Sequence, residues 1–294
     1  MILLNGKATA ATIREKLSQQ VHAVQVSGGK VPHLAVMLIG NDPASHTYVN
    51  AKLKACQEVG FRSTLIQHAT IQEADLLRHI EHINNDSTID GLVVQLPLPP
   101  HISVQKVIHH MKPEKDVDGF HALNCGRMAR NLPAHVPATP LGILTLLAHY
   151  QIETRGKHCV IVGRSHTVGA PLSILMSQDS YPGNATVTLC HSHTQHLDEF
   201  TRQADILVAA VGKSRLITAS MVKAGAVVID VGITREPDKT RKLGYRLQGD
   251  VDFVQVAPRC SYITPVPGGV GPMTIAALLL NTLRAAQSKV YTSD

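Results

Sequence analysis

Short apolar runs alternate with longer helical patterns along most of the 294 residues, and this alternation constrains the fold more than any other feature. The runs are rich in Val and Ile, so they predict parallel strands that are buried on both faces. They lie at 34–39, 89–96, 159–162, 185–190, 206–210 and 226–231. Helical patterns occur at 8–26, 43–59, 73–84, 140–149, 168–179 and 272–288. The predicted fold class is therefore α/β, with wound parallel sheets.

The length favours two domains, and two irregular stretches divide the pattern. Residues 111–140 contain several prolines and no sustained period, which predicts a functional loop that leads to a domain boundary. The helix that begins at Leu141 is expected to connect the two halves. Residues 258–271 are also irregular and precede a final helix that could fold back on either domain.

Composition excludes several classes of protein. No stretch approaches the ~18–20 apolar residues of a membrane-spanning helix, and Met1–Leu4 is too short for a secretory signal. The five cysteines are scattered without a C-x-x-C, so neither a disulfide framework nor a zinc site is indicated, and we expect a reducing cytoplasm. The net charge of +6 would suit a polyanion, but the absence of Trp and of any long Lys/Arg block argues against nucleic acid. A phosphorylated cofactor or an acidic small substrate would use the same charge.

A candidate dinucleotide-binding turn follows the run 159–162. Gly163 and Gly169 bracket the turn, and a helical pattern follows, so the N–H groups of a helix N-terminus can point at a phosphate. The spacing is G-x-x-x-x-x-G and not G-x-G-x-x-G, and an ordinary strand-to-helix turn would also explain it.

The residues after the next strand favour NADP over NAD. An NAD-binding domain usually places an acid there, whereas this chain has His191-Ser-His-Thr194. Arg164 and Ser192 could hold a 2′-phosphate instead. His191, His193 and His196 also suggest a metal, but no acid or cysteine completes a ligand set, so we predict no metal and solvated or ribose-side histidines.

The pattern at 43–59 carries a candidate catalytic face. Asp42 can cap this helix and Gly60 can end it. Ser45, Tyr48 and Lys52 fall on one face at i, i+3 and i+7. Alone, Tyr-x-x-x-Lys is typical of two surface side chains that extend their polar ends into water.

Two further segments carry polar groups where chemistry is common. Gln95 ends an apolar strand, where a buried amide must find partners and where parallel sheets present ligand-binding groups. Asp116 and Asp118 lie beside Gly119, in an arrangement that is usual for a turn and that can also hold a ring-nitrogen donor. A satisfied core amide and a solvated turn are the structural alternatives.

Together these segments resemble the bifunctional methylenetetrahydrofolate dehydrogenase/methenyltetrahydrofolate cyclohydrolase family, from Asn5 to the last helix. The segments that carry the resemblance are 43–52, 90–99, 113–120, 137–140, 163–165, 230–233 and 265–274. The resemblance implies an N-terminal folate-binding domain over 1–139, completed by the C-terminal helix 272–294. It also implies a Rossmann-like NADP-binding domain over 140–271, an active-site cleft between the two domains, and a homodimer.

The resemblance also assigns roles to residues. It implies that Lys52 is the catalytic base or proton relay, Tyr48 its neighbour over the substrate, and Gln95 the amide that positions it. Asp118 is implied to anchor the pterin ring. Substrate contacts are further implied for Val94, Leu96, Pro267, Gly268, Gly269, Val270 and Gly271. Cofactor contacts are implied for Gly163, Arg164, Ser165, Ser192 and Ile233.

The implied function is NADP-dependent oxidation of 5,10-methylenetetrahydrofolate and hydrolysis of the methenyl product to 10-formyltetrahydrofolate. The substrate is expected to be a tetrahydrofolate derivative that can carry a polyglutamate tail. A dehydrogenase without the hydrolytic step is the nearest alternative, and the presence of both Lys52 and Gln95 argues against it. A non-catalytic anion-binding protein and an NADP oxidoreductase for shikimate-like or amino-acid substrates are more distant alternatives.

Overall fold

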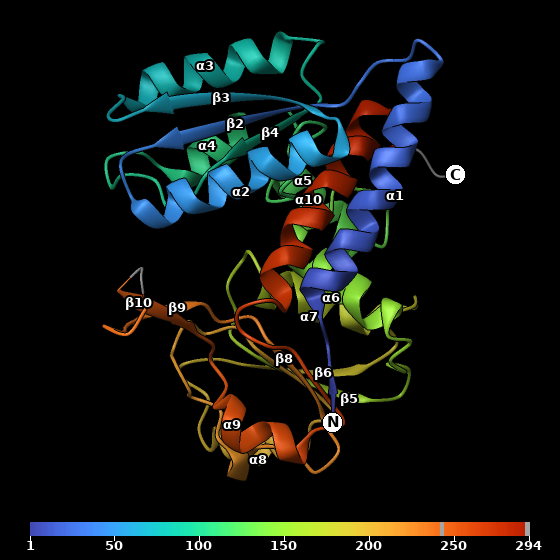
Figure 1. Cartoon of the computed structure of the whole chain (residues 1–294), viewed down its shortest axis with the longest axis vertical. Helices are drawn as coiled ribbons and strands as arrows, with labels where there is room; N and C mark the ends of the chain where they lie inside the picture. Colours follow the sequence, from blue (N-terminus) through green and yellow to red (C-terminus); the bar gives the residue numbers. More distant parts are fainter. Residues whose placement is uncertain (242–243, 292–294) are drawn as a thin grey trace. The chain divides into compact units, whose positions relative to one another are not determined.

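Helices and parallel strands alternate along the chain in the computed structural model, which describes residues 1–241 and 244–291 (Figure 1). The predicted α/β class is confirmed, because both larger sheets are parallel. The chain forms two compact units. Unit 1 comprises Met1–Ala10 and Thr139–Thr274, and unit 2 comprises Ala11–Ala138 and the chain from Ile275 onward.

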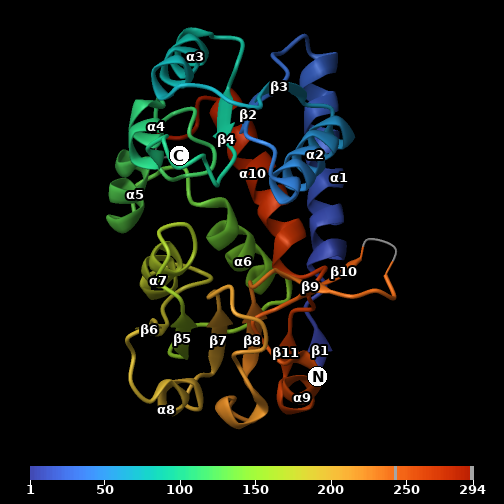
Figure 2. The same cartoon turned by 90° about the vertical axis from the view of Figure 1, so that its left-hand side faces the viewer.

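Unit 2 contains a three-stranded parallel sheet with helices on both faces. Its order is β3-β2-β4, with β2 at His33–Ile39, β3 at Arg62–His68 and β4 at Gly91–Val94. The helices are α2 (Pro43–Val59), α3 (Glu73–Asn85) and α4 (Val104–His110). Figure 2 shows α3 and α4 on one side of the sheet and α2 on the other. Every residue of the central strand β2 is buried, as its apolar run predicts.

Local signals fix both ends of α2. The Asp42 carboxylate accepts hydrogen bonds from the backbone N–H of Ser45 at 2.7 Å and from its hydroxyl at 2.8 Å. Gly60 ends the helix in the left-handed region, with φ 80°. The predicted bounds of this helix and both of its caps are confirmed.

Unit 1 contains a six-stranded parallel sheet in the order β1-β11-β8-β7-β5-β6, and Figure 2 shows the strands side by side in this order. The strands are β1 (Ile2–Leu3), β5 (His158–Val162), β6 (Thr186–Cys190), β7 (Ile206–Ala209), β8 (Val227–Asp230) and β11 (Tyr262–Ile263). The first residues of the chain belong to unit 1 because β1 pairs with β11. Strands β7 and β8 are buried throughout, which matches their apolar sequence except at Asp230, the last residue of β8.

The remaining elements connect or extend these sheets. The helices are α1 (Gly6–Val26), α5 (Ala122–Ala129), α6 (Ala138–His149), α7 (Gly169–Ser177), α8 (Leu197–Thr201), α9 (Phe253–Val256) and α10 (Val270–Ala286). Short 3-10 turns occur at Ala219–Met221 and Ala257–Arg259. Strands β9 (Thr234–Pro237) and β10 (Tyr245–Gln248) form an antiparallel hairpin. No helix in the described part of the chain has the length and apolar character needed to cross a membrane.

Several elements are not among the predicted ones, namely α4, α5, α8, α9, β1, β3, β9, β10 and β11, and α5 and β3 show two reasons for this. The stretch 111–140, predicted as a loop, contains α5, whose first turn is capped by the His121 side chain and which buries Asn124 and Met128 at i and i+4. Strand β3 was not predicted, because it is the edge strand of its sheet and exposes Ser63, Leu65 and Gln67 between partly buried residues.

Candidate functional site

The predicted pair Lys52 and Gln95 meets in unit 2. The Lys52 ammonium donates a hydrogen bond to Gln95 Oε1 at 3.1 Å. Gln95 follows β4, and its backbone N–H donates to the carbonyl of Met37 at 2.9 Å. Its Nε2 donates to the carbonyl of Leu96 at 2.6 Å, so the amide oxygen is directed to Lys52. The amide is therefore an oriented acceptor for the lysine.

Helix α2 presents Lys52 on its less buried side. Tyr48 lies one turn before Lys52 and is 40% exposed, whereas Val49 and Cys56 are fully buried. Burial raises the pKa of the Cys56 thiol to about 12, although Lys52 opposes this rise. Cys56 therefore stays protonated and adds no negative charge beneath the lysine.

The turn that contains Asp118 places a carboxyl group near Lys52. The Gly119 N–H donates to the carbonyl of Asp116 at 3.0 Å, and Gly119 adopts φ 75°. A Cβ at Gly119 would lie 2.6 Å from the nitrogen of Pro137, so only glycine fits. Burial raises the pKa of the Asp118 carboxyl, and the nearby Lys52 ammonium opposes the rise.

A buried hydrogen-bond network holds this turn. Asp116 is fully buried, and its Oδ2 accepts from the backbone N–H of His121 at 2.6 Å and from Asn124 Nδ2 at 3.0 Å. Burial raises the pKa of Asp116 to about 7. The Asn281 amide of α10 donates to the carbonyl of Val117 at 2.8 Å. Asp116 is thus a buried structural group, not the solvated turn residue that was one of the two alternatives.

The supporting asparagines were not identified from the sequence. Asn124 also donates to the carbonyl of Pro113, and its Oδ1 accepts from the Tyr291 hydroxyl at 2.9 Å. The contacts of Asn124 and Asn281 join segments that are far apart in the chain. The only sequence signal was the interruption of the apolar run 275–280 by Asn281.

Unit 1 brings four of the predicted cofactor residues to one cavity of about 410 Å³. Gly163, Arg164, Ser165 and Ser192 line it, near the carboxyl ends of β5, β6 and β7. Parallel sheets commonly bind nucleotides at this edge.

The two glycines of the predicted turn are required by close backbone contacts. Gly163 adopts φ 119°, and a Cβ there would lie 2.1 Å from the carbonyl oxygen of Ala210. A Cβ at Gly169 would lie 1.8 Å from the carbonyl oxygen of Gly163. The turn at the start of α7 can therefore form only with glycine at both positions.

The chemistry of this cavity fits a phosphorylated nucleotide. Among its described lining residues there is no Asp or Glu, and Arg164 and Lys213 contribute positive charge. His191 also lines the cavity, and its Nδ1 accepts from the backbone N–H of His193 at 3.2 Å. Lys213 was not singled out from the sequence, because it stands alone in a loop after β7.

The remaining predicted residues of unit 1 lie near one another. Ile233 follows β8 and is 39% exposed, and a Cβ at Gly271 would lie 3.6 Å from its Cδ1. Gly268 adopts φ 108°, and its carbonyl accepts from the Lys7 N–H at 2.8 Å. A Cβ at Gly269 would lie 2.6 Å from the carbonyl oxygen of Pro265. The backbone of 265–271 is therefore tightly held, with Pro267 exposed and Val270 buried.

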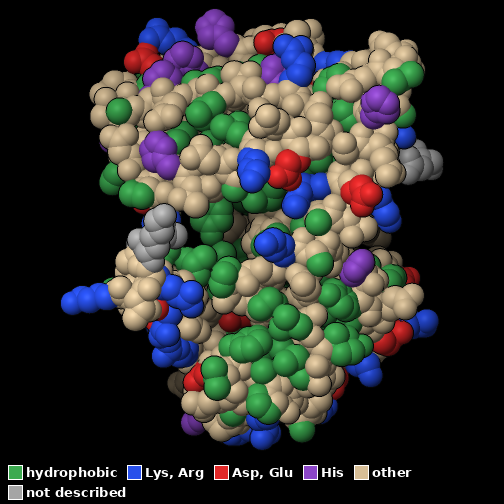
Figure 3. Space-filling view, viewed as in Figure 1, with side chains coloured by type: hydrophobic (Ala, Val, Ile, Leu, Met, Phe, Trp, Pro, Cys, Tyr) green, Lys and Arg blue, Asp and Glu red, His purple; other side chains and the backbone are tan. Residues whose placement is uncertain are grey.

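A larger cavity in unit 2 contains none of these residues. It has a volume of about 880 Å³, and its lining includes His68, His79, His82 and His101. Figure 3 shows histidine side chains gathered over the region of α3. No group of His, Cys, Asp or Glu in the described residues is arranged to hold a metal ion. Cavity size alone therefore does not locate the candidate site.

Known proteins match both units. The model of the tetrahydrofolate dehydrogenase/cyclohydrolase catalytic domain matches residues 4–118, and that of the NAD(P)-binding domain matches residues 137–290. The bifunctional protein FolD of Amoebophilus asiaticus is 64% identical over 291 residues, which cover 99% of this chain and 98% of that protein.

Solved structures agree with the sequence matches. The bifunctional FolD methylenetetrahydrofolate dehydrogenase/cyclohydrolase of Campylobacter jejuni is 43% identical, with a TM-score of 0.92 over 98% of this chain and 99% of that one. The Trypanosoma brucei enzyme, solved with NADP and an inhibitor, is 36% identical, with a TM-score of 0.93 over 99% of each chain.

Proposed function

The chain belongs to the tetrahydrofolate dehydrogenase/cyclohydrolase family, and from this premise we propose which of its residues carry out each step of a bifunctional reaction. The enzyme oxidises 5,10-methylenetetrahydrofolate to the methenyl compound and hydrolyses that product to 10-formyltetrahydrofolate. When bound, NADP supplies the acceptor for the hydride of the methylene carbon.

We propose that the cavity of unit 1 holds the cofactor. Arg164 and Ser192 bind the 2′-phosphate, through a charge-assisted contact and a hydroxyl. Gly163 and Ser165 allow the backbone to approach the pyrophosphate at the start of α7. Ile233 is assigned a further contact with the cofactor. The acid-free lining of the cavity supports this assignment.

Proton transfer in the hydrolytic step is assigned to Lys52. Water that attacks the methenyl carbon must lose a proton, and a ring nitrogen must gain one as its bond to that carbon breaks. Lys52 relays these protons, Gln95 holds its ammonium, and Tyr48 lies over the substrate. The 3.1 Å hydrogen bond from Lys52 to the oriented amide is the observation that carries this proposal.

The pterin ring is assigned to the Asp118 turn. Its carboxylate accepts hydrogen bonds from the pterin edge. Val94 and Leu96 flank Gln95 at the end of β4, and we assign further substrate contacts to them. Substrate contacts are proposed separately for the tightly held backbone of 267–271 in unit 1. We assign folate binding to 1–139 with 272–294, and NADP binding to 140–271.

Three finer properties are also part of the proposal. A homodimer is inferred from family membership, and a cytoplasmic location agrees with five unpaired cysteines. The positive net charge suits a polyglutamate tail on the substrate.

Absorbance of methenyltetrahydrofolate tests the proposed function directly. With methylenetetrahydrofolate and NADP, the absorbance should rise and then decay, and NAD should support much slower formation. Methenyltetrahydrofolate added without any cofactor should decay faster than its spontaneous rate. If it decays only at that rate, the chain is a dehydrogenase without the hydrolytic activity.

A further inference from the structure

Two buried aspartates of unit 1 hold loops beside the proposed cofactor cavity. Asp230 ends β8, Asp250 follows β10, and the two residues are 3% and 0% exposed. Neither forms an ion pair with a Lys or Arg among the described residues. Backbone N–H groups bind both carboxylates instead.

Asp250 binds the loop that follows β7. Its Oδ2 accepts from the backbone N–H of Val211 at 2.7 Å and of Gly212 at 3.0 Å. Gly212 adopts φ 67°, which allows two successive N–H groups to meet one oxygen. Val211 lines the cofactor cavity together with its neighbours Ala210 and Lys213. The carboxylate therefore fixes a wall of the cavity without lining it.

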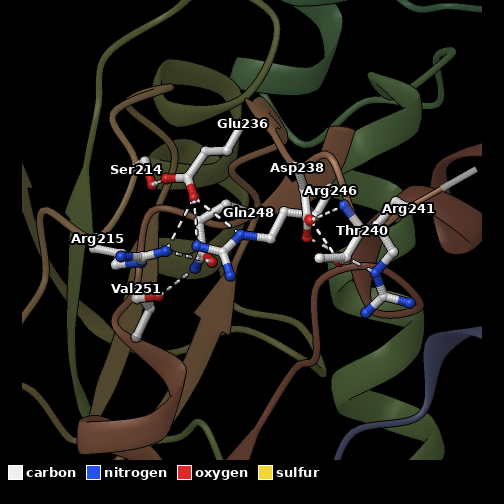
Figure 4. A network of polar contacts seen from close by, with 9 residues as sticks. All are labelled: Ser214, Arg215, Glu236, Asp238, Thr240, Arg241, Arg246, Gln248 and Val251. Atoms are coloured by element: carbon white, nitrogen blue, oxygen red, sulfur yellow. Dashed lines mark hydrogen bonds and ion pairs between the residues drawn. The ribbon is translucent and has the colours of Figure 1, made fainter. Parts of the chain in front are cut away.

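The far end of the same loop is bound to the β9–β10 hairpin. Figure 4 shows Glu236 facing Ser214 and Arg215, and its carboxylate accepts from both side chains. The Arg215 N–H donates to the carbonyl of Gly249 at 3.1 Å. The loop 211–215 is thus held at its start by the Asp250 carboxylate. At its end it is held by the Glu236 carboxylate and the carbonyl of Gly249.

Asp230 holds Asp250 and the loop that follows β8. Its Oδ1 accepts from the N–H of Asp250 at 2.9 Å and of Gly232 at 3.0 Å, and its Oδ2 accepts from the N–H of Val251 at 3.0 Å. A Cβ at Gly232 would lie 2.2 Å from the Asp250 carboxyl carbon, so this loop packs directly on the second carboxylate. The next residue in the loop is Ile233.

We propose that Asp250, supported by Asp230, is a positioning residue for cofactor binding. It holds the loops after β7 and β8 in the conformation that forms the cofactor cavity, and it touches neither cofactor nor substrate. Without its carboxylate, two N–H groups lose their acceptor, and the loop that carries Lys213 is released. The inference rests on the proposed location of the cofactor in unit 1.

The test measures NADPH binding and the two activities separately. In Asp250→Ala, the dissociation constant for NADPH, followed by its fluorescence, should rise about tenfold or more, and the KM for NADP should rise with it. Hydrolysis of methenyltetrahydrofolate without cofactor should stay within about twofold of the parent, because it does not need the cavity. The matched control is Asp252→Ala, which alters a carboxylate two residues away that caps α9.

An unchanged NADPH dissociation constant in folded Asp250→Ala would overturn the inference. Equal losses of NADPH binding and cofactor-free hydrolysis would also overturn it, since they would show a general role in folding. If Asp250→Ala does not fold, Asp250→Asn decides, because it keeps an acceptor oxygen but loses the charge. We expect a two- to fivefold rise there, and no rise contradicts the inference. A parent enzyme that fails to bind NADPH would instead refute the proposed function.

Discussion

Lys52 donates its hydrogen bond to the neutral amide of Gln95 and not to a carboxylate. An amide can orient a lysine without holding it in the ammonium form as strongly as a carboxylate would. Asp118 supplies the nearby negative charge, and burial raises its pKa. The group that orients the lysine and the group that carries charge are therefore separate residues.

Substitution of Arg164 tests the assignment of the cofactor's 2′-phosphate. In Arg164→Ala, the KM for NADP should rise tens-fold, because one charge-assisted phosphate contact is worth roughly 1.5–3 kcal/mol. The KM for NAD should barely change, since NAD lacks the 2′-phosphate. Steady-state kinetics with both cofactors checks this. If Lys213→Ala shows the effect and Arg164→Ala does not, Lys213 holds the phosphate.

Asp116 gives a pH-dependent prediction for stability. Its pKa is raised from 3.8 to about 7, so the folded protein binds a proton more tightly than the unfolded chain does. This stabilising contribution is fully present below about pH 4 and is lost as pH rises through 7. Asp116→Asn imitates the protonated form. Its free energy of unfolding should therefore exceed that of the parent by roughly 1–3 kcal/mol at pH 8, and by little at pH 4.

Denaturant unfolding at several pH values measures this difference. Asp86→Asn is the control, and the pH dependence of its effect on stability should have the opposite sign. The reason is that a hydrogen bond from Thr88 lowers the pKa of Asp86. A difference between Asp116→Asn and the parent that stays constant from pH 4 to pH 8 would show that Asp116 does not titrate in this range.

At the scale of elements, the C-terminal helix α10 supports the Asp118 turn. The Asn281 amide donates to the carbonyls of Val117 and Val136 at 2.8 and 2.9 Å. Asn281→Leu keeps a similar volume but leaves two buried acceptors without a donor, which should cost roughly 2–4 kcal/mol of stability. The KM for the folate substrate should rise and that for NADP should not.

Thr282→Val is the matched control, because the Thr282 hydroxyl donates within the helix, to the carbonyl of Leu278 at 2.8 Å. Thermal unfolding and folate kinetics of the two variants check this prediction. Equal effects of both substitutions would mean that Asn281 contributes packing only, and that the turn does not depend on α10.

Local chemistry explains which elements could be predicted from the sequence. The bounds of α2 follow from Asp42, Pro43 and Gly60, which act within one turn of the helix ends. Strand β3 could not be found by its hydrophobic pattern, because it lies at the edge of its sheet and all of its residues are exposed or only partly buried. The partners of Asp116 and Asp250 depend on contacts between distant segments, so no local pattern identifies them.

At the scale of the whole molecule, two chemical tasks are assigned to two units of one chain. Unit 1 contains the acid-free cavity and the loops that Asp230 and Asp250 hold. Unit 2 contains Lys52, Gln95 and the Asp118 turn. Hydride transfer removes no proton, whereas hydrolysis requires proton transfer, so the two activities should respond differently to loss of the lysine.

The rate of methenyltetrahydrofolate hydrolysis by Lys52→Met tests this division most directly. Methionine keeps the bulk of the side chain and removes the amine. Hydrolysis should fall by about 10²-fold or more, while a reduced dehydrogenase activity accumulates the methenyl compound. Lys54→Met, at an exposed position on the same helix, should keep both activities. Hydrolysis by Lys52→Met at near the parent rate would contradict the assignment and make Lys52 an ordinary surface residue of α2.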